Sequence, residues 1–179
     1  MPRPTGIGPK ALVLEVMAIS SFTDPPNRKK SSMENKNYSF NGAYFITICT
    51  KDRHEIFGKI DNGVMLPSEV GRIAVEMIQR METVYESVVL DAFVLMPNHV
   101  HMLILLLHER KNPTIQRIIQ QYKGVVTKKA GFSLWQYRYH DHVVYDAAEF
   151  RRIREYIRDN PRRWENDYHY AKGPLAQSR

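Results

Sequence analysis

Two histidines stand out as residues whose spacing could support chemistry. His99 and His101 are two apart in an apolar stretch, and residues two apart on a β-strand project from the same face. Two neighbouring imidazoles form half of a metal site, although the pattern alone does not name the metal. The same pattern also arises when polar residues lie on a half-exposed strand.

A tyrosine and an asparagine near the C-terminus could complete such a site. At about 100° per residue, Phe150, Ile153 and Ile157 form one apolar stripe of a helix. Tyr156 and Asn160 lie four apart on its flank and are therefore neighbours. The stripe would dock on the sheet beside the histidines and so deliver a phenol and an amide oxygen to the imidazoles. The remaining positions of the helix are expected to face water: Arg151, Arg154, Glu155 and Arg158.

Phosphoryl transfer is the chemistry that these residue types could perform together. A divalent ion could polarise a scissile phosphate and orient it for in-line attack. Tyr156 would be the nucleophile, and because a free tyrosine has a pKa of about 10 it would need activation. Attack would leave a phosphotyrosyl bond, which stores the energy needed to rejoin a strand. Tyr122 is an alternative nucleophile, but it lies in the apolar stripe of an earlier helix.

The elements expected to position these residues alternate between strands and helices. Periodicity and residue type predict strands at 43–50, 88–96, 99–107 and 135–144, with 88–107 at the centre of the sheet. Helices are expected to begin at Ser68, Thr114 and Asp146, with Gly131 ending the second and Asn160-Pro161 the third. This order predicts an α+β fold, ferredoxin-like or RRM-like, in which helices cover one face of a largely antiparallel sheet.

Composition places the chain among ordinary globular proteins. Its 179 residues include 26 Lys and Arg against 19 Asp and Glu, giving a net charge of +7 that arises entirely after residue 110. A charge concentrated in this way points to a polyanionic partner, or to a surface that is basic only for solubility. Cys49 is the only cysteine, which excludes an intrachain disulfide and a multi-cysteine zinc site and favours the cytoplasm.

The domain organisation expected from composition is simple. Residues 1–37, rich in proline, are expected to form a flexible extension, 38–170 a single domain and 171–179 a tail. The apolar stretch at 11–21 is too short to span a bilayer, which needs about 20 apolar residues, so no membrane is expected as a partner.

Four segments together resemble a known enzyme family. They are GAYFITICTKDR (Gly42 to Arg53), FVLMPNHVHMLILL (Phe93 to Leu106), LWQYRYHDHVV (Leu134 to Val144) and FRRIREYIRDNPRRW (Phe150 to Trp164). In this order they resemble the single-tyrosine HUH transposases of the insertion sequence 200 type, and most of all the REP-associated tyrosine transposases (RAYTs). No second tyrosine stands one helical turn from Tyr156, which disfavours the two-tyrosine replication initiators.

The resemblance implies an activity and a role for each site residue. It implies a DNA transposase and endonuclease that uses Mg²⁺ or Mn²⁺ to cut single-stranded, hairpin-bearing DNA, leaving a 5′-phosphotyrosine and a free 3′-OH. His99, His101 and Asn160 match the metal ligands, and Tyr156 matches the nucleophile. The family includes dimers, so a homodimer is possible. A domesticated relative could instead act on host repeats.

Basic and aromatic side chains provide candidates for DNA contacts. His142 could orient the site or the DNA, but a structural role is equally expected. Tyr137 and Tyr139 could stack on bases, and Trp164 is expected to pack. The basic candidates are Lys51, Arg53, Lys123, Lys128, Arg138, Arg151, Arg152 and Arg158.

Two other enzyme classes fit the sequence less well, and a non-enzymatic class is an alternative. Leu103 stands where a histidine-triad hydrolase needs a third histidine, and the Cys-x-x-Cys pair of zinc deaminases is absent from the sequence. The non-enzymatic alternative is an RNA- or DNA-binding module with an RRM-like sheet. Such a module would bind without metal and would not need Tyr156.

Overall fold

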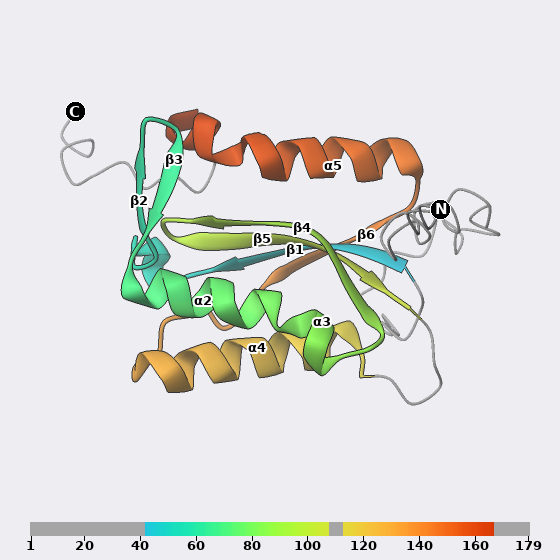
Figure 1. The fold of residues 1–179 in the computed structure, drawn as a ribbon, viewed down its shortest axis with the longest axis horizontal. Coiled ribbons are helices and arrows are strands. Elements are labelled where there is room, and N and C mark those ends of the chain that lie inside the picture. The colour runs from blue at the N-terminus through green and yellow to red at the C-terminus, as the bar shows by residue number, and fades with distance from the viewer. Residues whose placement is uncertain (1–41, 108–112, 167–179) are drawn as a thin grey trace, which may run out of the picture.

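A four-stranded antiparallel sheet forms the centre of the molecule (Figure 1). The computed structural model of the protein describes residues 42–107 and 113–166, so the expected extension at 1–37 and tail at 171–179 lie outside it. The elements are β1 (Gly42–Cys49), η1 (Lys51–Arg53), β2 (Gly58–Asp61), β3 (Val64–Pro67), α2 (Glu69–Gln79), α3 (Met81–Val84), β4 (Val88–Met96), β5 (His99–Leu106), α4 (Ile115–Ala130), β6 (His140–Val144), α5 (Ala147–Asp159) and η2 (Asn160–Asn166).

The strand order differs in part from the expected one. β4 and β5 form the predicted hairpin through Pro97 and Asn98, but the sheet order β4-β5-β1-β6 puts β4 at an edge. β5 and β1 are the central strands, and every residue of β5 is buried. A strand with neighbours on both sides and layers on both faces can be apolar throughout, as β5 is after its histidines.

The three long helices begin at the predicted positions, and each has a capping side chain there. Ser68, Thr114 and Asp146 each accept a hydrogen bond from the backbone N–H three residues later, which satisfies one of the unpaired donors of a helix start. Gly131 ends α4 with a φ of 81°, a left-handed conformation that glycine adopts without strain. Local capping chemistry therefore fixed these boundaries correctly.

The helices cover both faces of the sheet, which corrects the expectation of a single covered face. α2 and α4 lie on one face and α5 on the other (Figure 1). Val100, Met102 and Ile104 of β5 join the larger core beneath α2 and α4, whereas Leu103 and Leu105 join a smaller core beneath α5. Because β5 is apolar on both sides, each side needs its own covering layer.

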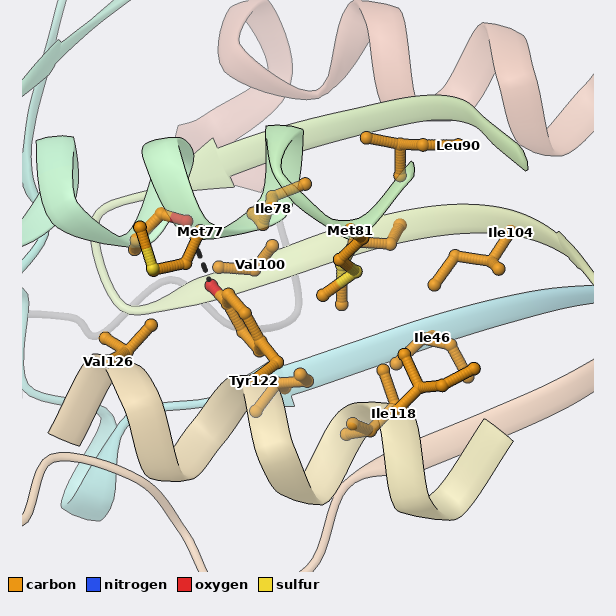
Figure 2. Packing of buried hydrophobic residues seen from close by; sticks show 14 of the residues in the cluster. Ile46, Met77, Ile78, Met81, Leu90, Val100, Ile104, Ile118, Tyr122 and Val126 are labelled. Carbon is orange, nitrogen blue, oxygen red and sulfur yellow. Dashed lines mark hydrogen bonds between the residues drawn. The ribbon is translucent and has the colours of Figure 1, made fainter. Parts of the chain in front are cut away.

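The larger core consists almost entirely of interlocking apolar side chains (Figure 2). Ile118 and Val126 of α4 face Ile78 and Met77 of α2 across this layer, and all four are buried. Tyr122 is the polar exception shown there, and its hydroxyl donates a hydrogen bond of 3.4 Å to the carbonyl of Ala74. This layer stabilises the fold and contains no cluster of reactive groups.

Two features were not expected from the sequence. β2 and β3 form a hairpin with a turn at Asn62 and Gly63, whose φ values of 50° and 74° are those of a tight hairpin turn. The β2–β3 hairpin projects from the sheet and lies beside the C-terminal end of α5 (Figure 1). The predicted strand 135–144 is regular only over β6, with a separate bridge between Thr50 and Trp135.

No helix within the described part of the chain is long and apolar enough to cross a membrane.

Candidate active site: a histidine pair and a tyrosine

The two histidines of β5 converge on one point on the α5 side of the sheet. Both are buried, and their Nε2 atoms lie 3.0 Å apart, with the ring centroids 4.5 Å apart. Two ligands at right angles on an ion with bonds of about 2.1 Å are also about 3.0 Å apart. The prediction that β5 presents two imidazoles side by side is confirmed in its geometry.

The outer nitrogen of each imidazole is held by a neighbouring side chain. Asn98 Oδ1 lies 2.8 Å from Nδ1 of His99, and Thr47 Oγ1 lies 2.8 Å from Nδ1 of His101. An amide oxygen can only accept a hydrogen bond, so Nδ1 of His99 donates and Nε2 of the neutral ring presents its lone pair. Such partners fix ring orientation in metal sites.

Sequence reasoning missed both of these partners. Asn98 could have been found from its position next to His99 in the turn. Thr47 is 54 residues from His101 and faces it only because β1 pairs with β5 in this register. Nothing local in the sequence specifies that register.

Tyr156 of α5 reaches the histidine pair. Its hydroxyl oxygen lies 3.4 Å from His101 Nε2, and 38% of the residue remains exposed. Phe45 of β1 stacks on His101 with ring centroids 5.1 Å apart and meets Tyr156 edge-on at 6.1 Å. The phenol is therefore next to the imidazoles and still open to a substrate.

Asn160 and Trp164 extend the site along the chain. Tyr156 contacts His101, and Trp164 lies with its ring 5.9 Å from that of His99. Asn160, halfway between them in sequence, is 1% exposed and is the first residue of η2. Trp164 is buried, as expected, and covers the His99 side.

The donor set fits a divalent ion that accepts both nitrogen and oxygen ligands. Two imidazole nitrogens come from β5, and the amide of Asn160 and the phenol of Tyr156 offer oxygens. Over residues 42–107 and 113–166, no group of three or more His, Cys, Asp or Glu side chains could hold a metal ion. An ion here would thus have few protein ligands, which leaves positions for phosphate oxygens.

An ion pair fixes α5 two residues before Tyr156. Arg154 donates to both carboxylate oxygens of Asp91, with distances of 2.8 and 2.5 Å, and its hydrogen bonds to Asp91 raise the pKa of Arg154. Asp91 lies where the β4–β5 register shifts. The expectation that Arg154 faces water is therefore wrong, because this irregularity in β4 offers it a carboxylate. Bidentate pairs of this kind constrain geometry strongly.

Tyr122 does not belong to the site. It lies on α4, on the opposite side of the sheet from His99 and His101, and it is 5% exposed. Burial raises the pKa of its hydroxyl far above the usual value of tyrosine. Tyr122 is therefore a core residue, in agreement with its place in the apolar stripe.

Lys51 and Arg53 are the predicted DNA contacts that the structure places near the histidine pair. Lys51 and Arg53 follow β1 at the edge that carries His99, and the carbonyl of Arg53 accepts a hydrogen bond from Asn98. Arg158, the second-last residue of α5, lines a hollow of about 400 Å³ together with the β2–β3 hairpin. Arg151 and Arg152 are exposed on α5, and Arg138 is exposed in the segment before β6.

Two other predicted contacts lie elsewhere. Lys123 and Lys128 belong to α4, on the face opposite the histidines. Lys123 donates to the backbone carbonyls of Gln136 and Tyr137 at 2.8 and 3.0 Å, and burial lowers its pKa. A lysine used in this way braces a loop, which the sequence pattern could not reveal.

His142 joins β6 to the start of α5. Its Nε2 lies 2.8 Å from Glu149 Oε1, and the other oxygen of Glu149 accepts the backbone N–H of Tyr145 at 3.0 Å. Burial alone would raise the pKa of Glu149, but these hydrogen bonds lower it overall. Of the two roles considered for His142, this geometry matches the structural one.

Comparisons with known proteins bear on the fold and on the family. A solved structure of a REP-associated tyrosine transposase bound to a REP hairpin superimposes with a TM-score of 0.58 and 19% identity, over 74% of each chain. The chain therefore shares the fold of this transposase, and the resemblance inferred from the sequence is confirmed at the level of the fold.

A relative in sequence defines the family. An uncharacterised protein of Haemophilus influenzae is 30% identical over 169 residues, covering 81% of this chain and 94% of that protein. The chain belongs to the same family as this protein. No family model matches the sequence.

Proposed function

We propose that the protein is a metal-dependent transposase and endonuclease that nicks hairpin-bearing single-stranded DNA and transfers it through Tyr156. The observation that carries the proposal is the 3.4 Å between Tyr156 Oη and His101 Nε2, beside a second imidazole nitrogen 3.0 Å further on. A nucleophile next to two converging metal-type ligands is the arrangement that phosphoryl transfer requires. The DNA-hairpin complex formed by the structurally similar transposase supports the substrate class.

The proposed step exchanges one phosphodiester for another. The oxygen of Tyr156 attacks the scissile phosphorus and forms a tyrosyl phosphodiester with the 5′ side of the break. The bond to O3′ breaks, and this oxygen gains a proton to become a free 3′-OH. The phenol proton passes to solvent, to which Tyr156 is open with 38% of the residue exposed. Rejoining is the reverse attack by a 3′-OH.

His99, His101 and Asn160 would hold the divalent ion, Mg²⁺ or Mn²⁺. Such an ion supplies charge stabilisation at the phosphate oxygens and favours deprotonation of the phenol. Thr47 and Asn98 keep the two rings oriented, and Phe45 fills the space against His101 and Tyr156. Because Tyr156 reaches the histidines of its own chain, the proposed reaction needs no second subunit.

The test is the formation of a covalent protein–DNA species. Labelled hairpin oligonucleotides with single-stranded flanks are incubated with the protein and Mn²⁺ or Mg²⁺ and then resolved on a denaturing gel. Wild type should give a shifted band that depends on metal, and Tyr156→Phe should give none. The matched control is Tyr145→Phe, which removes a hydroxyl from a comparably exposed tyrosine just before α5 and should behave as wild type.

The same experiment separates the proposal from the binding-module alternative. A non-catalytic RNA- or DNA-binding protein would retain oligonucleotides in native gels with metal chelated but would form no covalent band. A covalent band that persists in Tyr156→Phe would refute the nucleophile while leaving a nuclease function intact.

A further inference from the structure

We propose that Tyr137 is a stacking platform for an unpaired base of single-stranded DNA, on a segment that adjoins the end of β1 and is held in place by Lys123. The inference rests on the proposed function and extends it with a substrate contact outside the reacting centre. Three independent features support it: the exposure of the ring, the bracing of its backbone and its place at the end of β1.

The ring of Tyr137 is hardly buried by the rest of the protein. The residue is 95% exposed, more than any other large hydrophobic side chain in the described part of the chain. A single exposed aromatic side chain is common on protein surfaces and does not by itself indicate a binding site. A ring that is both exposed and firmly supported is different, because the support reduces the entropy lost when a ligand stacks on it.

The backbone that carries Tyr137 is braced from α4. Lys123 Nζ donates to the carbonyls of Gln136 and Tyr137, at 2.8 and 3.0 Å. In return, the indole N–H of Trp135 donates to the carbonyl of Lys123 at 3.1 Å. Trp135 is itself buried against Phe57, with ring centroids 5.2 Å apart. Three hydrogen bonds and a buried anchor thus fix the segment that displays an exposed ring.

This segment adjoins the end of β1, whose last residue pairs with His99 of β5. Gln136 N–H donates to the carbonyl of Cys49 at 3.0 Å, and Cys49 is the partner of His99 across β1 and β5. Neighbouring strands lie about 4.8 Å apart, so the backbones of Gln136 and His99 are separated by about 10 Å. A DNA strand bound at the histidines and passing the end of β1 would have about this distance to cover to reach the segment of Tyr137.

The charges around the ring suit a polyanion. Arg138 follows Tyr137 and is exposed, and the exposed Lys51 is joined to the same segment by its N–H bond of 2.8 Å to the carbonyl of Leu134. Asp52 and Glu55 are the acidic residues of the adjacent loop and offset part of this charge. Stacking of a base on an aromatic ring contributes about 1–3 kcal/mol to binding and is possible for every base. The site would therefore distinguish single-stranded from double-stranded DNA but would not select a base sequence.

The test measures binding without chemistry. Affinity for a fluorescent single-stranded oligonucleotide is measured by anisotropy with metal chelated, in the Tyr156→Phe background. Tyr137→Ala is expected to raise the dissociation constant about 5- to 150-fold, which corresponds to the loss of one stacked base. Tyr137→Phe and Tyr137→Trp keep a ring and should stay close to the parent. Tyr145→Ala, which truncates an exposed tyrosine outside this segment, should also bind as the parent does.

The outcomes distinguish this inference from the function on which it rests. If the parent binds the oligonucleotide and Tyr137→Ala binds equally well, the stacking platform is overturned and the proposed function stands. If Tyr137→Phe is as weak as Tyr137→Ala, the hydroxyl and not the ring makes the contact, and the inference is also overturned. If the parent binds no single-stranded DNA at all, the proposed function falls as well.

Discussion

The two faces of the central sheet are built from the same strands but bury different kinds of side chain. Beneath α2 and α4, β5 contributes Val100, Met102 and Ile104 to an apolar core with no reactive cluster. Beneath α5, the alternate residues of the same strand begin with His99 and His101 and become apolar only at Leu103 and Leu105. One face mainly stabilises the fold, and the other combines a smaller core with polar groups.

This difference shows how a small domain can remain stable although it buries a polar site. Burying an imidazole costs free energy unless its nitrogens find partners. Thr47 and Asn98 supply such partners on the α5 side, and the larger apolar core on the other side supplies most of the burial that holds the sheet together. Substitutions on the two faces should accordingly affect different properties.

The largest expected effect comes from removing a histidine. His101→Ala should lower metal-dependent cleavage by more than about a hundredfold, since loss of an outer partner alone costs about 10- to 100-fold at metal sites. Affinity for DNA with metal chelated should largely remain. The measurements are gel-based cleavage and anisotropy. Unchanged cleavage would show that the pair is not the metal site.

A substitution in the opposite face should affect stability instead. Ile118→Ala removes a fully buried side chain of α4 and should lower the free energy of unfolding by about 2–5 kcal/mol. Urea denaturation followed by circular dichroism measures this change. The folded fraction of Ile118→Ala should cleave DNA as fast as wild type. Slower cleavage by this folded fraction would show that packing under α4 affects the site under α5.

A smaller effect is expected from the support of His101. Thr47→Val preserves the shape of the side chain but removes its contact with Nδ1, and it should weaken Mn²⁺ binding about 10- to 100-fold. Calorimetric titration or Mn²⁺ resonance spectroscopy would detect this. Thr127→Val, on α4, is the matched control and should bind Mn²⁺ normally. Equal binding by Thr47→Val would limit the hydroxyl to a structural role.

The smallest effect should come from acidification at the start of α5. Asp146 accepts the N-cap hydrogen bond, chiefly from the backbone N–H of Glu149, and this lowers its pKa; the pKa of Glu149 is also lowered overall. A depressed folded-state pKa adds stability above the unfolded-state value of about 4 to 4.5, and this stability is lost as pH falls further. The urea midpoint should therefore drop between pH 5.5 and 3, and less steeply in Glu149→Gln. An identical drop in both proteins would contradict this contribution.

Much of the candidate site follows from local sequence. The spacing of His99 and His101 places both rings on one face of a strand, and the four-residue spacing of Tyr156 and Asn160 places both on one flank of a helix. The N-caps Ser68, Thr114 and Asp146 were equally readable. These features depend only on the period of one element and on hydrogen bonds a few residues apart.

Tertiary structure decided what no local pattern encodes. The pairing of β1 with β5 brought Thr47 to His101, and the register shift of β4 gave Arg154 its carboxylate at Asp91. The placement of α5 on its own face of the sheet, and the use of Lys123 as a brace, also depend on long-range packing. Alternative strand orders and docking faces satisfy the same hydrophobic periodicity, so only the summed burial and hydrogen bonding of the whole chain distinguish between them.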